Sequence, residues 1–161
     1  APQTKLIVDA NEGASPATVQ ALCQAMADLG VAMVEQPIPA GQDAVLATFV
    51  HPLPICADEA FHTRSDLAQI AERYDLVNIK LDKTGGLTEA LAVLEEAERR
   101  GLDVMVGCML GSSLAMAPAT VVADRASIVD LDGPLLLSRD REPGLTYDGS
   151  LLHPPSAALW G

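Results

Sequence analysis

The sequence predicts an α/β fold in which the strands of a parallel sheet alternate with helices. Short runs rich in β-branched residues alternate with longer runs rich in Ala, Leu and Glu through the first 130 residues. The first residues of successive expected strands are 26, 23, 21, 27 and 24 positions apart, which leaves room for one strand, one helix and two loops. Continuous apolar strands between helices are typical of a parallel sheet covered by helices. Two architectures fit this pattern, a doubly wound sheet and a (β/α)8 barrel.

Each strand is expected where a short apolar run lies between polar or Gly/Pro-containing segments. Taken in order, the expected strands are Leu6–Asp9, Ala32–Glu35, Ile55–Asp58, Leu76–Lys80, Asp103–Val106 and Ser127–Asp130.

Two helices between these strands have clear start and stop signals. The first is expected over Pro16–Leu29, because Ser15 is a favourable N-cap, proline suits the first turn and Gly30 ends the run. The second is expected over Leu87–Arg100 and ends before Gly101.

Composition excludes several classes of function. The chain has 22 acidic and 10 basic residues, a formal net charge of −12, which argues against binding nucleic acid or an anionic membrane through a basic patch. No apolar run reaches the roughly 18 residues that suggest a membrane span. The three cysteines, Cys23, Cys56 and Cys108, are far apart and lie in apolar runs, so we expect reduced core thiols and a cytoplasmic protein.

Acidic residues end three consecutive expected strands: Asp9, Glu35 and Asp58. The carboxyl ends of parallel strands lie on one face, which carries the active site in barrels and open sheets alike. A single aspartate at a strand end is often the N-cap of the next helix, but three in succession would repel one another unless a cation lies between them. Oxygen ligands favour a hard divalent ion, so the sequence predicts a Mg²⁺ site.

Lys80 ends the next strand, in the stretch VNIKLDKTGG. Near a bound cation its ammonium pKa should fall, which would make it an effective base. A metal that binds a carboxylate substrate, together with a lysine base, suits removal of a proton from the adjacent carbon. The alternative is an ordinary lysine that extends from the strand end into solvent.

The stretches LIVDANEG, MVEQP, ICADEAF, VNIKLDK and VDLDGPLLL together resemble the enolase superfamily, in its muconate-lactonizing-enzyme-like subgroup, and within that the dipeptide epimerases of the L-Ala-D/L-Glu epimerase type. The resemblance implies a (β/α)8-type barrel of which this chain carries about six βα units, strands three to eight. It implies Asp9, Glu35 and Asp58 as Mg²⁺ ligands and Lys80 as the catalytic acid/base. It also implies that Asp130 and Asp132, a D-x-D pair, bind the α-ammonium group of a dipeptide.

The implied activity is epimerisation of dipeptides through a metal-stabilised enediolate, in an isomerase. The runner-up in the same superfamily is a cycloisomerase or an o-succinylbenzoate synthase-like lyase, which would have no need for an ammonium site. A non-catalytic fragment is the alternative from another class. A receiver-like phosphorylation switch fits poorly, because its acidic pair lies on one strand.

Two departures from the family pattern are visible. Residues 1–132 are expected to form a partial barrel domain and residues 133–161 a C-terminal tail, while the capping domain and the first two barrel strands are absent from this chain. We therefore expect a homo-oligomer or association with the remainder of the same polypeptide, and no epimerisation by the isolated 161 residues. Relatives often have Glu where Gly111 stands, which leaves the preferred dipeptide open.

Overall fold

The computed structural model describes residues 3–161 and contains one six-stranded parallel sheet. Its strands are β1 (Leu6–Asp9), β2 (Val31–Glu35), β3 (Ile55–Ala57), β4 (Leu76–Ile79), β5 (Asp103–Val106) and β6 (Ile128–Val129). They pair in chain order from β1 to β6. A doubly wound sheet reverses its strand order partway, so this order identifies part of a barrel and confirms the predicted fold class.

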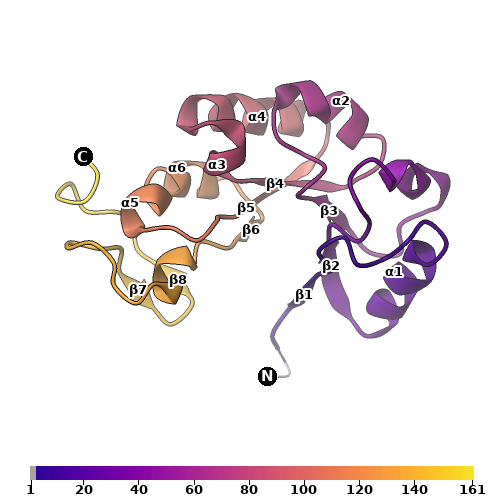
Figure 1. The fold of residues 1–161 in the computed structure, drawn as a ribbon, viewed down its shortest axis with the longest axis horizontal. Helices are drawn as coiled ribbons and strands as arrows, with labels where there is room; N and C mark the ends of the chain where they lie inside the picture. The colour runs from indigo at the N-terminus through magenta and orange to yellow at the C-terminus, as the bar shows by residue number, and fades with distance from the viewer. Residues whose placement is uncertain (1–2) are drawn as a thin grey trace.

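Helices cover the outer side of the curved sheet (Figure 1). The two longest are α1 (Val19–Asp28) and α4 (Leu87–Arg99). The shorter helical segments are η1 (Asp43–Thr48), η2 (Arg64–Asp66), α2 (Leu67–Ile70), α3 (Leu81–Thr84), α5 (Ser113–Met116), α6 (Ala119–Ala123) and η3 (Gly133–Leu136). The main hydrophobic core lies between helices and sheet, where α4 contributes the fully buried side chains of Val93 and Leu94.

The opposite face of the sheet carries a separate, smaller apolar cluster, formed by Met33, Cys56, Leu76, Met105 and Ile128. Each comes from a different strand, β2 to β6. Because successive side chains of a strand alternate between faces, residues two and four positions farther along also point to this inner face. The alternation therefore decides which strand-end side chains can meet.

The expected helix over Pro16–Leu29 begins later than predicted. Residues 16–18 form a turn, and α1 begins at Val19. The hydroxyl of Ser15 bonds to that of Thr18, 3.0 Å away, rather than capping a backbone N–H of the helix. The expected helix over Leu87–Arg100 agrees with α4 to within one residue.

Residues 133–161 contain η3 and a short antiparallel hairpin of β7 (Tyr147–Asp148) and β8 (Leu151–Leu152). The hairpin is attached next to β6, because the Tyr147 hydroxyl donates a hydrogen bond of 2.7 Å to the carbonyl of Leu131. Of the three cysteines, Cys23 and Cys56 are buried, Cys108 is half-buried, and all are free thiols, as predicted. No helix within residues 3–161 is both long and apolar enough to cross a membrane.

Candidate active site at the carboxyl ends of the strands

The three predicted carboxylates lie on the inner face of the sheet, at the carboxyl ends of the strands. Asp9 and Glu35 are register partners at the ends of β1 and β2. Glu35 is in turn paired with Cys56 of β3, and Asp58 follows two residues later. Alternation thus sends all three side chains to the same side.

Glu35 is a buried carboxyl group, 4% exposed. One of its oxygens, Oε1, accepts a hydrogen bond of 2.6 Å from Nδ2 of Asn78 on β4. Burial raises the pKa of Glu35 to about 7; the bond from Asn78 opposes this rise, and the charges of Asp58 and Asp9 add to it. Glu35 is therefore poised between its neutral and charged forms near pH 7.

Asn78 itself lies tightly against the next strand. An added Cβ at Gly107, directly after β5, would come within 2.6 Å of Asn78 Oδ1, so only glycine leaves room for the amide there. That Oδ1 atom is buried and has no hydrogen-bond partner. The site thus holds an oxygen that nothing in the described protein satisfies.

Asp58 is held by two lysines. The Lys80 ammonium lies 2.5 Å from Oδ2 of Asp58, while Lys83 bonds to Oδ1 and donates a hydrogen bond of 2.7 Å to the Asp58 main-chain carbonyl. Burial alone would raise the pKa of Asp58, but the charges of Lys83 and Lys80 outweigh it and lower the pKa. Asp58 is therefore an ionised carboxylate despite its burial.

The two lysines have opposite pKa shifts. Burial acts to lower the pKa of Lys80, but its bond to Asp58 and the nearby carboxylates raise it overall. For the more deeply buried Lys83, burial prevails and the pKa falls, with Lys80 adding to the effect. The lowered pKa predicted for Lys80 assumes a bound cation nearby; the groups of the chain by themselves raise it.

The residues present fit a hard divalent cation. Glu35, Asp9 and Asp58 are an all-oxygen donor set, and the pKa of Glu35 is raised first by its burial and then by the charges of Asp58 and Asp9, effects that a bound cation would oppose. Within residues 3–161 no three acidic, thiol or imidazole groups are gathered closely enough to be ligands as they stand. As the chain stands, both oxygens of Asp58 are bonded to lysines and Oε1 of Glu35 is bonded to Asn78.

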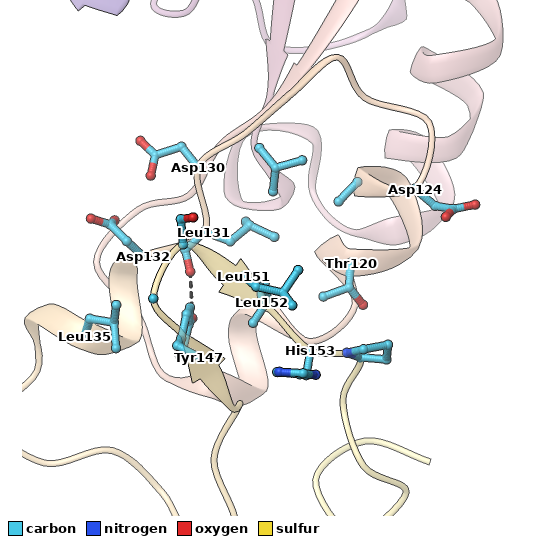
Figure 2. Close-up of a pocket in the computed structure, with 15 residues that line it drawn as sticks. Thr120, Asp124, Asp130, Leu131, Asp132, Leu135, Tyr147, Leu151, Leu152 and His153 are labelled. Carbon is cyan, nitrogen blue, oxygen red and sulfur yellow. Dashed lines mark hydrogen bonds between the residues drawn. The ribbon is translucent and has the colours of Figure 1, made fainter. Parts of the chain in front are cut away.

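Asp130 and Asp132 follow β6 and lie on the same side of the chain, with Leu131 between them (Figure 2). Partial removal from water raises the pKa of Asp130 and the charge of Asp132 adds to it, while Lys80 opposes the rise. They line a cavity of about 600 Å³ together with the apolar side chains of the β7–β8 hairpin. The charge of Lys80 thus reaches Asp130, and the cavity beside Asp130 and Asp132 is large enough to take a ligand.

At Gly111 the space for a side chain is already filled. A Cβ there would come within 2.9 Å of the Met116 methyl and 3.3 Å of the Ala115 Cβ. The terminal methyl of Met116 therefore packs where a larger residue would begin.

Three polar residues of the site were not assigned from the sequence: Asn78, Lys83 and Glu59. Asn78 could have been found, because it lies two positions before Lys80 and alternation places both on the inner face. The contact of Lys83 with Asp58 joins residues 25 positions apart, and no local pattern indicates it. Glu59 has a buried carboxylate oxygen without a partner.

The chain is similar to characterised racemases and epimerases. It is 55% identical over 152 residues to the L-Ala-D/L-Glu epimerase of Escherichia coli, covering 94% of this chain and 47% of that protein. It is 49% identical over 161 residues to the N-acetyl-D-glutamate racemase of a Pseudoalteromonas species, covering 100% of this chain and 51% of that protein. The chain therefore spans about half the length of the curated relatives it matches.

Solved structures give the same result. An enolase family member from Agrobacterium tumefaciens with homology to dipeptide epimerases, described with bound sodium and L-Ala-L-Glu, superposes with a TM-score of 0.97 at 55% identity, over 100% of this chain and 49% of that chain. A dipeptide epimerase from Methylococcus capsulatus, complexed with Mg and L-Arg-D-Lys, superposes with a TM-score of 0.87 at 31% identity, over 95% of this chain and 46% of that chain. The family model for enolase C-terminal domain-like proteins matches residues 1–153. The chain belongs to the enolase superfamily, as part of its C-terminal barrel domain, and is closely related to the L-Ala-D/L-Glu epimerases.

Proposed function

We propose that the protein is a Mg²⁺-dependent epimerase of dipeptides that removes and returns the proton on the carbon next to a carboxylate. One observation carries the proposal: three carboxylates, a lysine and an aspartate pair lie at the carboxyl ends of the strands of one sheet. The 55% identity to an L-Ala-D/L-Glu epimerase supports the same reaction. Since the chain spans about half of that relative, the proposal concerns the whole protein.

Asp9, Glu35 and Asp58 would hold the Mg²⁺ ion. When bound, the ion would bind the substrate carboxylate and stabilise the negative charge that develops as the α-proton leaves. Asn78 would orient Glu35 through the hydrogen bond it already donates.

Lys80 would carry the transferred proton on its Nζ atom. It lies on the inner face, at the start of α3, and its ammonium group contacts Asp58. To accept a proton it must first lose the bond to Asp58, because that carboxylate stabilises the charged amine. The proton-transfer role therefore requires that Asp58 take another partner.

Asp130 and Asp132 would bind the α-ammonium group of the dipeptide. Two carboxylates that face one side of the chain suit a cationic group. This feature favours a free amino terminus over the N-acetylated substrate of the Pseudoalteromonas relative. It also favours an epimerase over a cycloisomerase or a synthase-like lyase of amine-free diacids.

Proton NMR in D₂O tests the proposal, with L-Ala-L-Glu, Mg²⁺ and the longest available form of the protein. We expect loss of the Glu α-proton signal and appearance of the second diastereomer. N-acetyl-glutamate and an amine-free diacid are the comparison substrates. Faster turnover of either comparison substrate would contradict the assignment of Asp130 and Asp132, and no α-proton exchange in any substrate would contradict the reaction.

A further inference from the structure

Gln36 directly follows Glu35 and has an unusual backbone. Its φ is +30°, in a region that residues other than glycine rarely adopt, and a proline follows it. Its side chain is fully buried. Such a conformation persists only where the surroundings hold it in place.

The side-chain amide of Gln36 uses all four of its hydrogen-bonding positions. Oε1 accepts bonds from the backbone N–H groups of Asp58, at 2.8 Å, and Ala60, at 3.1 Å. Nε2 donates to the carbonyl of Ile38, at 2.8 Å, and to the hydroxyl of Tyr74, at 3.0 Å. The amide therefore fixes the start of the loop that carries Asp58.

The backbone of Gln36 joins two further segments. Its N–H donates to the carbonyl of Cys56 on β3, at 2.9 Å, and its carbonyl accepts a bond of 2.8 Å from the N–H of Glu12, in the loop after β1. Gln36 thus lies next to Glu35 and is bonded both to the loop that follows Asp9 and to the segment that carries Asp58.

The Tyr74 hydroxyl, which accepts a bond from Nε2 of Gln36, is itself held by a further hydrogen bond. The Tyr74 hydroxyl donates to Oδ2 of Asp43, at 3.0 Å, and Arg73 donates to Oδ1 of the same aspartate, at 2.8 Å. Asp43 and Tyr74 are both buried. Gln36 consequently has little freedom to shift when Asp58 changes its partner.

We propose that Gln36 is a positioning residue that sets the mutual spacing of the Asp9, Glu35 and Asp58 carboxylates for a divalent cation. The inference rests on the proposed function, since it assumes that these carboxylates bind a metal. Gln36 does not contact the metal in this proposal; it holds the three strand-end loops through its four side-chain and two main-chain bonds.

The test measures metal affinity rather than turnover. Gln36→Leu keeps most of the buried volume and removes all four amide bonds, and Val93→Ala is the control because it disturbs the core at α4, a helix that carries none of the three carboxylates. Mn²⁺ binding is followed by electron paramagnetic resonance and Mg²⁺ binding by calorimetry, on the longest available form of the protein. We expect Gln36→Leu to weaken binding at least tenfold and Val93→Ala to leave it within twofold, although both lower the unfolding midpoint.

If Gln36→Leu does not fold, Gln36→Asn takes its place, and its shorter amide should weaken binding at least threefold. If the parent protein binds the metal and the Gln36 variant binds it with equal affinity, this inference is overturned and the proposed function stands. Equal weakening in the Val93→Ala control would also overturn it, since the effect would then be one of general stability. Failure of the parent to bind Mg²⁺ or Mn²⁺ would overturn both.

Discussion

At the scale of single residues, Asp58 is bonded to three residues of the site, because Lys80, Lys83 and Gln36 all bond to its side chain or to its backbone. The two lysines differ in accessibility. The Lys80 side chain is 13% exposed and that of Lys83 is 8% exposed, with its ammonium 5.8 Å from the centre of the Phe61 ring. Lys83 is thus the more deeply buried partner of Asp58, and Lys80 is the more accessible of the two lysines.

Replacing Lys80 with Met should abolish exchange of the substrate α-proton while the fold remains. Positioned acid/base groups contribute about 10²- to 10⁴-fold to rate, so we expect a fall of at least about 100-fold. Lys83 still neutralises Asp58, which limits the loss of stability. Exchange is measured by NMR in D₂O, with Asp82→Asn, an exposed change in the same turn, as the control. Normal exchange in Lys80→Met would remove this lysine from the mechanism.

The pKa of Glu35 predicts a specific dependence of stability on pH. Because its folded pKa is about 7 against an ordinary value of 4.5, the folded state binds more protons than the unfolded state between these values. The free energy of unfolding should therefore fall as pH rises from about 4.5 to about 7, by on the order of 3 kcal/mol. Glu35→Gln should flatten this slope in urea titrations with EDTA. Added Mg²⁺ should restore stability at pH 8 in the parent but less in the variant, and an unchanged slope in Glu35→Gln would contradict the assignment.

At the scale of elements, alternation and chain order explain how much could be predicted. Strand-end positions such as Asp9 and Glu35 could be read from the sequence, because strand periodicity is local and all parallel strands end at one edge. The start of α1 at Val19 could not, because the turn at Ser15 depends on a bond between two hydroxyls. The contacts of Lys83 and Gln36 join distant loops, and these depend on the completed sheet rather than on any sequence period.

His51 joins η1 to the starts of β3 and β4, at the end of the sheet opposite the site. Its Nδ1 lies 2.7 Å from the Asp75 carboxylate and its Nε2 lies 3.0 Å from the carbonyl of Leu46. Both partners are acceptors, so only the doubly protonated ring satisfies them. The bond to Asp75 raises the pKa of His51, against the effect of burial.

Because the folded pKa is raised, His51 contributes stability that is fully present below its unfolded pKa and is lost as pH rises through the folded pKa. His51→Gln should therefore destabilise the protein at pH 6 and have a much smaller effect at pH 9. Urea unfolding at the two pH values measures this difference. His153→Gln, a change to an exposed histidine, is the control and should alter stability equally little at both.

Ser113 connects α5 to the C-terminal segment. Its hydroxyl bonds to Asp140 and accepts a bond of 2.8 Å from the Leu145 N–H, and Asp140 also accepts from the Ser113 N–H, at 3.0 Å. Ser113→Ala should cost about 1–3 kcal/mol, since it removes two bonds from a buried group. Trypsin should then cleave the exposed Arg139 and Arg141 sites several-fold faster, as followed by mass spectrometry. Ser112→Ala is the matched control, and equal cleavage of both variants would contradict this role.

At the scale of the whole molecule, six strands leave two sheet edges without neighbours in residues 3–161, at β1 and β6. Both edges expose apolar side chains: Leu6 is 57% exposed, Ile7 41% and Val129 46%. Unpaired edges with apolar side chains favour association with other chains. The inner face and its charged groups are consequently covered only in part by the described chain.

Residues 1–161 alone place both lysines of the site on one carboxylate, which bears on whether they can invert a substrate. Inverting a carbon centre requires a proton acceptor on one face and a donor on the other, yet the ammonium groups of Lys80 and Lys83 both contact the same carboxylate, that of Asp58. Isolated residues 1–161 should therefore show no inversion of L-Ala-L-Glu by NMR in D₂O, even with Mg²⁺ present. They should also associate as concentration rises, in light scattering, and Ile7→Lys should reduce that association because it places a charge on the β1 edge. Appreciable inversion by a monomeric preparation would mean that these residues already supply both proton-transfer groups.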